Sequence, residues 1–181
     1  TLSATASTVT ATISRNGDLV SKMYLETDST FDLDGKANPG SYLIDEVELE
    51  IGGQRIDRHY GHYMETYAQL TEPNSAAMVG TGGATASNVY PTSTLFQAMS
   101  AMGGVKIAAG VAGVKHIPLQ FWFCRNPGLA LPLIALQYHE VKIILDHAIS
   151  TSFTGGAFNK LWADYIYLDT DERRRFAQVS H

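Results

Sequence analysis

Residues 116–145 read HIPLQFWFCRNPGLALPLIALQYHEVKIIL, a stretch dense in aromatic and β-branched side chains. Such residues fit the pleated surface of a β-sheet. Arg125-Asn126-Pro127-Gly128 interrupts the stretch, and proline followed by glycine is typical of a tight turn. The pattern predicts a strand, a turn and a second strand. Because both flanks are too apolar for a solvated face, both strands are predicted to lie in the core of a β-sandwich.

Length and composition predict one folded domain. The chain has 181 residues, 45% of them hydrophobic and 17% charged, with a net charge of −5. A surface this poor in charge favours extensive contact with protein partners, and the negative charge disfavours direct binding of nucleic acid. The single cysteine, Cys124, cannot form an internal disulfide and is predicted to be a small buried residue.

The first part of the chain predicts several strands. Thr8–Ile13 alternates threonine with small or apolar residues, and Leu19–Thr27 forms a second apolar run. Asn16-Gly17 between them predicts a type I′ hairpin that would pair the two strands. A polar loop follows, and its Asp32, Asp34, Gly35 and Asn38 lack the further ligands of a calcium-binding loop. We expect a solvated loop there.

Residues 42–51 show the clearest two-residue period in the chain. Val47, Leu49 and Ile51 are expected to face the core, and Glu46, Glu48 and Glu50 to face solvent. Gly52-Gly53 predicts a turn, after which Gln54–His59 returns as a strand with Ile56 on the apolar side. Glutamates two residues apart lie ~6–7 Å apart along a strand, which is too far to share a proton. We interpret them as a solvated face.

The period changes after residue 60. Tyr63, Tyr67 and Leu70 follow helical spacing, which predicts a short amphipathic helix over Gly61–Leu70 that ends before Pro73. From Pro73 to Val105 there is no charged residue, so this long segment is expected to pack against a neighbouring subunit. Leu95, Phe96, Met99 and Met102 predict a helical turn near its end.

The remaining segments complete an all-β fold. Val105–Val111, Val114–Phe123 and Leu161–Leu168 are predicted strands, Thr151–Gly156 is a predicted loop, and the charged run Asp169–Phe176 follows. Eight short strands with short helices in the loops predict an antiparallel, eight-stranded jelly-roll sandwich.

No catalytic, cofactor-binding or metal site is predicted. Metal ligation needs side chains that converge on one ion, and the histidines are scattered without a His-x-His or His-x-Asp pair. No Gly-x-Ser-x-Gly motif is present. The alternative function is a carbohydrate-binding β-sandwich module, which would use surface aromatic side chains as platforms. Trp122, placed between two phenylalanines, is more consistent with a core position.

Four segments, in order, resemble the major capsid proteins of nucleocytoplasmic large DNA viruses, the double jelly-roll family of iridoviruses and phycodnaviruses. They are Arg15-Asn16-Gly17-Asp18-Leu19 with Tyr24-Leu25, Val47–Asp57 followed by His59-Tyr60-Gly61, Phe121–Val141, and Tyr165–Ala177. The resemblance implies a non-enzymatic structural protein that assembles into homotrimeric, pseudo-hexagonal capsomers of an icosahedral capsid. It also implies contacts with neighbouring capsomers and minor capsid proteins, proximity to an internal viral membrane, and assembly in the host cytoplasm.

The resemblance also implies a domain division. Residues 1–172 would be the N-terminal jelly roll without its first strand or arm, and residues 173–181 would begin the linker to a second jelly roll that is absent from this sequence.

Overall fold

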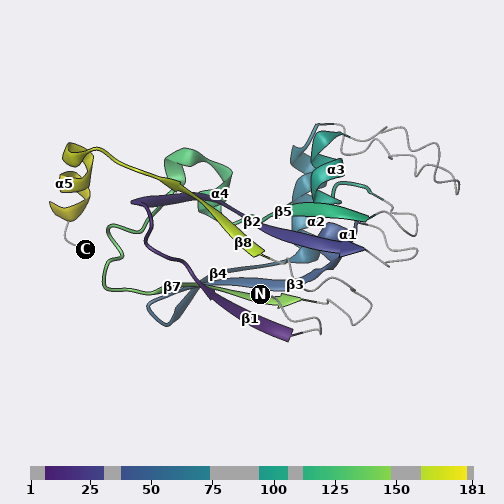
Figure 1. Ribbon diagram of the computed structural model, residues 1–181, viewed down its shortest axis with the longest axis horizontal. Helices are drawn as coiled ribbons and strands as arrows, with labels where there is room; N and C mark the ends of the chain where they lie inside the picture. Colours follow the sequence, from purple (N-terminus) through teal and green to yellow (C-terminus); the bar gives the residue numbers. More distant parts are fainter. Residues whose placement is uncertain (1–6, 31–37, 74–93, 106–111, 148–159, 179–181) are drawn as a thin grey trace, which may run out of the picture.

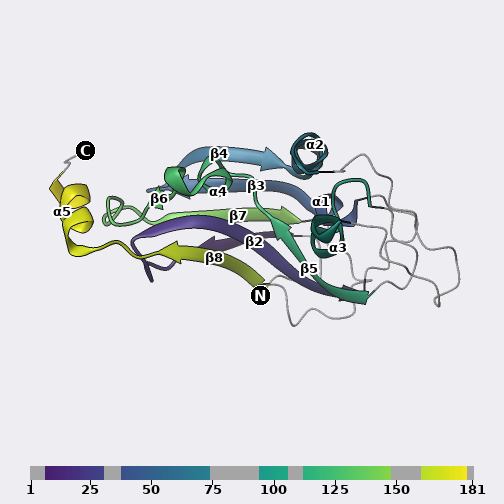
Figure 2. The ribbon, with the colours of Figure 1, turned by 90° about the horizontal axis from the view of Figure 1, so that it is seen from above.

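Two antiparallel β-sheets pack face to face in the computed structural model, which describes residues 7–30, 38–73, 94–105, 112–147 and 160–178 (Figures 1 and 2). The first sheet has the order β1-β7-β3-β4, and in the second β2 pairs with β5, β6 and β8. The strands of the described residues are β1 (Ser7–Thr12), β2 (Leu19–Thr30), β3 (Ile44–Ile51), β4 (Gln54–Tyr60), β5 (Ala112–Pro118), β6 (Leu131–Pro132), β7 (Val141–His147) and β8 (Lys160–Ile166). The predicted eight-stranded antiparallel jelly-roll sandwich is confirmed.

The inner faces of the two sheets form one aliphatic and aromatic core. In the first sheet Val47 lies opposite Leu145 and Leu49 opposite Ile143, and in the second Leu25 lies opposite both Ile117 and Leu161. The two-residue period of residues 44–51 is confirmed, because Val47 and Leu49 are fully buried while the three glutamates between and beside them are not. Burial of side chains of this size stabilises the fold by about 1.5–3 kcal/mol each.

Most of the helices lie at the ends of the sandwich. Figure 1 shows α1 (Pro39–Tyr42), α2 (Gly61–Thr71) and α3 (Leu95–Ser100) gathered at one end and α5 (Thr170–Gln178) at the other. Helices α2 and α3 confirm the two predicted helical segments. The short helix α4 (Trp122–Arg125) and the 3-10 turn η1 (Pro127–Leu129) lie in the connection between β5 and β6.

The prediction for residues 119–138 is partly wrong. The turn around Asn126-Pro127-Gly128 is confirmed as η1, but Trp122–Arg125 is helical and only Leu131–Pro132 pairs with β2 beyond it. Phe121 and Phe123 are fully buried with their rings stacked at 5.6 Å. Phe123 reaches the core from within α4, and Phe121 from the extended residue that precedes the helix. An apolar run of this length is compatible with either a buried strand or a buried helical turn, which is why the pattern was misleading.

The predicted Asn16-Gly17 hairpin is wrong, because β1 and β2 belong to different sheets. Ile13 donates its backbone N–H to Val141 of the first sheet, and Asp18 donates to Ile166 of the second, so the segment between them crosses the sandwich. Neither Asn16 nor Gly17 has a positive φ. Glycine is required at 17 for another reason: a Cβ there would lie 2.7 Å from the Cβ of Tyr165.

The turn at Gly52-Gly53 is confirmed, with φ values of +60° and +84°. Two side-chain orientations near it and in α2 differ from the prediction. Leu49 faces Asp57 while Glu50 faces Arg55, which makes Ile56 the extra residue of a β-bulge and leaves it 49% exposed. In α2 the buried positions are Met64 and Ala68, so the helical period is right but the predicted apolar face is displaced by about one residue.

Some predictions lie outside the described residues. They are the solvated loop with Asp32, Asp34 and Gly35, most of the uncharged segment after Pro73, nearly all of the strand at Val105–Val111, and the loop at Thr151–Gly156.

Candidate functional site

The titratable side chains do not gather into a catalytic or metal-binding centre in the part of the chain that the structure describes. No group of three or more His, Cys, Asp or Glu side chains is placed there to hold a metal ion. His116 lies on the outer face of the second sheet, 3.5 Å from Glu26, whereas His59 is buried at the end of β4. Within the described ranges, no helix has the length and apolar character to span a bilayer.

His59 is a core histidine with one polar contact. Its Nε2 accepts a hydrogen bond from the backbone N–H of Gln120 at 3.3 Å, and its ring packs edge-on against Phe121 at 4.7 Å. Its Nδ1 is buried and has no hydrogen-bond partner among the described residues. The pKa of His59 is lowered to about 4, mainly by burial; Asp57 opposes the shift and Arg125 adds to it. The imidazole is therefore neutral at physiological pH and supports the fold.

Cys124 lies in α4, partly buried against the core. Burial raises the pKa of its thiol to about 11. Because the thiolate is the nucleophilic form, this side chain is unsuited to catalysis at neutral pH and packs as a small apolar residue.

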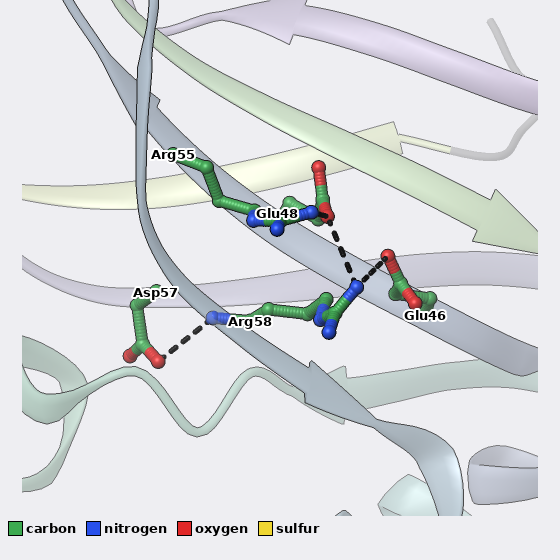
Figure 3. A network of polar contacts seen from close by, with 5 residues as sticks. All are labelled: Glu46, Glu48, Arg55, Asp57 and Arg58. Carbon is green, nitrogen blue, oxygen red and sulfur yellow. Dashed lines mark hydrogen bonds and ion pairs between the residues drawn. The ribbon is translucent and has the colours of Figure 1, made fainter.

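The glutamates of β3 are balanced by cations on neighbouring strands (Figure 3). Arg55 donates to Glu48 at 2.9 Å, and the Arg58 guanidinium lies 3.6 Å from Glu46 and 3.9 Å from Glu48. Burial alone would raise the pKa of Glu48, but the bond from Arg55 and the other contacts lower it overall. The glutamates therefore lie on the outer face, as predicted, but they form partly solvated cross-strand ion pairs that were not predicted. Each such pair is worth little by itself.

The connection between β1 and β2 organises one end of the sandwich. The guanidinium of Arg15 donates to the carbonyls of Leu136 at 2.8 Å, His139 at 3.0 Å and Gln137. These bonds hold the turns between β6 and β7 in place.

Asp18 fixes α5 to the same end. Its carboxylate accepts from the backbone N–H of Leu168 at 2.8 Å and from two nitrogens of Arg173 at 2.8 and 3.0 Å. The bond from Leu168 is the largest cause that lowers the pKa of Asp18, and Arg173 adds to it. Residues 170–176 of the charged run thus lie in α5. Arg173 pairs this helix with Asp18 of the sandwich, and Arg174 lies 3.8 Å from Asp171 within the helix.

Glu65 and Asn38 fix the other end. The Glu65 carboxylate accepts the backbone N–H groups of Gly103 and Gly104 at 3.0–3.1 Å, and Asn38 Oδ1 accepts those of Gly104 and Val105. Gly103 and Gly104 have φ values of +81° and +92°, which other residues rarely adopt. The segment that follows α3 is therefore tied to α2 and α1.

Large apolar side chains are exposed at both ends of the sandwich, next to the polar contacts described above. At the helical end Leu70 is 80% exposed and Leu95 77%, and at the opposite end Tyr138 is 87% exposed. Exposed aliphatic and aromatic side chains on a rigid support are typical of protein–protein contact surfaces. The exposed side chains at the two ends are therefore candidate contacts with other protein chains.

The tryptophans differ in position. Trp122 is half-buried and packs against the core, as predicted. Trp162 lies on the outer face of β8, 44% exposed, and donates its indole N–H to Glu26 at 2.7 Å. No role was predicted for Trp162, although the alternating pattern of residues 161–168 assigns it to the face opposite Leu161 and Ala163.

Comparison with known proteins gives consistent matches over nearly the whole chain. A family model described as "Major capsid protein N-terminus" matches residues 2–169. The major capsid protein of Pyramimonas orientalis virus is 46% identical over 96% of this chain and 43% of that protein. The major capsid protein of Paramecium bursaria Chlorella virus 1 is 39% identical over 96% of this chain and 39% of that protein.

A solved structure agrees with these matches. The crystal structure of PBCV-1 VP54, fitted into a cryo-EM reconstruction of the virophage Sputnik, superposes with a TM-score of 0.70 at 36% identity. The superposition covers 97% of this chain and 41% of that chain. This chain therefore spans about two fifths of the length of these relatives.

Proposed function

Because this chain belongs to the family of major capsid proteins, whose N-terminal part it matches, we propose that it forms a structural tile of the capsid of a large DNA virus. The protein would act as a capsid subunit that buries surface against other subunits, without catalysis. The observation that carries the proposal is the match of the family model to residues 2–169, whose described part folds as a two-sheet sandwich. In this reading the protein resides in the virion and assembles in the host cytoplasm.

We further propose the domain division that the sequence suggests. Residues 1–172 would form the first jelly roll, and residues 173–181 would begin the link to a second one in the full-length protein. The Asp18–Arg173 pair supports this reading, because it joins the first residue of the proposed link to the sandwich at 2.8 Å. The direction in which the chain leaves the sandwich would then be fixed by this contact.

The full-length subunits would form homotrimeric, pseudo-hexagonal capsomers through the helical end of the sandwich. Leu70 of α2 and Leu95 of α3 expose large aliphatic surfaces there, and α3 lies in the segment Pro73–Val105, which contains no charged residue. The cores of subunit interfaces are depleted in charge and enriched in apolar side chains. Contacts between capsomers, with minor capsid proteins and near an internal membrane would use the remaining, more polar surfaces.

Substitution at the two ends tests this arrangement. In the full-length protein, Leu95→Glu is expected to convert trimers to monomers at micromolar concentration, as measured by light scattering coupled to size exclusion. Tyr138→Glu is the matched control, because Tyr138 is at least as exposed as Leu95 but lies at the opposite end, and it should leave the trimer intact. A trimer that survives Leu95→Glu and dissociates with Tyr138→Glu would contradict the assignment of the helical end.

A monomeric wild-type protein that binds a glycan array would instead support the carbohydrate-binding alternative. Trp162 would be the platform to examine, since its ring is exposed and Lys160 lies 5.7 Å from it.

A further inference from the structure

A polar pocket of about 310 Å³ lies between the end of β4, the first turn of α2 and the segment that carries α4. Figure 2 shows these three elements along one edge of the molecule. The side chains that line the pocket include Asp57, Arg58, His59, Tyr63, Gln120 and Arg125. Direct contacts connect the three elements, since Gln120 binds His59 and Arg125 binds Tyr63. Separate segments of the chain therefore build the pocket together.

The imidazole of His59 is a buried hydrogen-bond donor without an acceptor. His59 is only 6% exposed, and its Nε2 accepts the backbone N–H of Gln120 at 3.3 Å. A neutral imidazole that accepts at Nε2 carries its proton on Nδ1. This Nδ1 is buried and has no partner among the described residues. Because buried polar groups in native proteins are nearly always paired, this donor indicates an acceptor that comes from outside the described residues.

Arg125 supplies an unpaired positive charge to the same pocket. Its Nη2 donates to the Tyr63 hydroxyl at 2.7 Å and to the Gln120 carbonyl at 3.1 Å, and its Cζ lies 4.9 Å from the centre of the Tyr67 ring. These contacts orient the guanidinium. Among the described residues, its Nε and Nη1 have no acceptor and no carboxylate forms an ion pair with it. The guanidinium can therefore accept an anionic partner without giving up an existing one.

The other charged groups of the pocket favour a ligand with a single negative charge. Arg58 lies 3.6 Å from Glu46 and 3.9 Å from Glu48, so its charge is already balanced (Figure 3). Asp57, which accepts the backbone N–H of Arg58 at 2.8 Å, is a negative charge of the pocket itself. A ligand with two negative charges would be repelled by Asp57 more strongly than a ligand with one.

The start of α2 adds backbone donors to the pocket. The helix begins at Gly61 after the N-cap residue Tyr60, whose side chain makes no capping hydrogen bond, and no acidic residue lies in the first turn. The first N–H groups of a helix have no partner within it and form the positive end of its dipole. An anionic group in the pocket would therefore lie beside a helix end that favours negative charge.

We propose that this pocket binds one carboxylate group. Arg125 is its charged partner, and His59 donates to it from Nδ1, either directly or through one ordered water. The carboxylate belongs to a free small organic acid or to an aspartate or glutamate side chain of another polypeptide segment, and two measurements separate these sources. A phosphate group fits less well, because it carries about −1.5 to −2 charges at neutral pH and Asp57 would repel it.

Titration with acetate tests for a free acid. The full-length protein is titrated with sodium acetate at pH 7.5, with chloride as the balancing anion at constant ionic strength. Calorimetry should give a Kd on the order of 1 mM, and Arg125→Gln should raise it about tenfold because a charged hydrogen bond is lost. Arg174→Gln is the matched control, since Arg174 is an exposed arginine of α5, away from the pocket, and it should leave the Kd unchanged.

Two results of this titration would overturn the proposal. One is an equal affinity for acetate in Arg125→Gln and in wild type, which would show that acetate binds elsewhere. The other is tighter binding of inorganic phosphate than of acetate at the same pH and ionic strength. Neither result depends on whether the protein forms trimers, so the capsid function is tested separately.

Zero-length cross-linking tests for an acidic side chain. Arg125→Lys places a primary amine in the pocket, and a carbodiimide joins this amine to a contacting carboxylate as an amide while the carbodiimide takes up the water. In the full-length protein, mass spectrometry of the peptides should show position 125 joined to an aspartate or glutamate other than Asp57. Wild type is the control, because a guanidinium does not form this amide.

The two measurements together decide the source of the carboxylate. Acetate binding without a cross-link identifies a free acid, and a cross-link to an acid other than Asp57 identifies a protein side chain. Absence of acetate binding, together with a cross-link to Asp57 alone or no cross-link, would overturn the proposal.

Discussion

Protonation of His59 is expected to weaken the fold as the pH falls below about 7. The folded protein disfavours the imidazolium, because Nε2 already accepts the N–H of Gln120 and the buried Nδ1 has no acceptor among the described residues. The pKa of His59 is therefore about 4 in the folded chain, against 6.5 when exposed. Below pH 6.5 the unfolded chain binds a proton that the folded chain does not, so stability decreases with decreasing pH.

The size of the effect follows from the two pKa values. A shift of one unit in pKa between the folded and unfolded chain corresponds to about 1.4 kcal/mol. Lowering the pH from 7.5 to 5 should therefore lower the free energy of unfolding by about 2 kcal/mol through this residue alone. Lowering it to 4 should cost about 3 kcal/mol, and the loss should level off below the folded pKa. These values are a substantial fraction of the stability of a domain of this size.

Urea unfolding at pH 7.5 and at pH 5 measures this change in the free energy of unfolding. In His59→Gln the side-chain oxygen can still accept from Gln120, but the group no longer titrates, so about 2 kcal/mol of the pH dependence should disappear. His62→Gln is the matched control, because His62 is exposed and stacks on Tyr60, and it should keep the wild-type dependence. If His59→Gln and wild type lose the same free energy between the two pH values, the reasoning is refuted.

Three further predictions concern the polar contacts at the two ends and the thiol. Glu65→Ala should lower the free energy of unfolding by about 2–3 kcal/mol and speed amide exchange at Gly103, because backbone donors lose a charged acceptor; unchanged exchange would contradict this role. Asp18→Asn should raise exchange in residues 168–178. In wild type the same loosening should appear only as the pH falls below 3.8 toward the lowered pKa of Asp18; tight protection in the variant would count against it. Cys124 should react with iodoacetamide at pH 7.5 more slowly than a free thiol until urea unfolds the chain, since burial raises its pKa to about 11; equal rates would show that the thiol is not buried.

The sandwich itself could be predicted because its signal is local. In β3 the alternation of valine and leucine with glutamate predicts one buried and one solvent-facing side, and the structure shows this alternation of burial. The turn at Gly52-Gly53 and the helices α2 and α3 were likewise predicted from residues that are adjacent or one turn apart.

The errors occur where distant contacts decide the local structure. Gly17 is a glycine because Tyr165 packs against it, and no residue near position 17 indicates that contact. Phe123 reaches the core from α4 and Phe121 from the extended residue before it, although their spacing is equally that of a strand.

The polar anchors of the candidate surfaces were also invisible to the sequence analysis. Glu65 binds the N–H of Gly103, 38 positions away, and its helix gives no sign of this partner. Arg15 donates hydrogen bonds to the backbone carbonyls of Leu136 and His139, which lie more than 120 positions later in the chain. Exposure of Leu70 was missed for a simpler reason: helical spacing identifies a stripe of residues but does not decide which neighbouring stripe faces the sheets.

Mass measurement of the full-length wild-type protein in solution tests the central claim most directly. Native mass spectrometry, or light scattering during size exclusion, should give the mass of three chains at micromolar concentration and physiological salt. A single-chain mass at every concentration examined would contradict a tile that functions by contact with copies of itself.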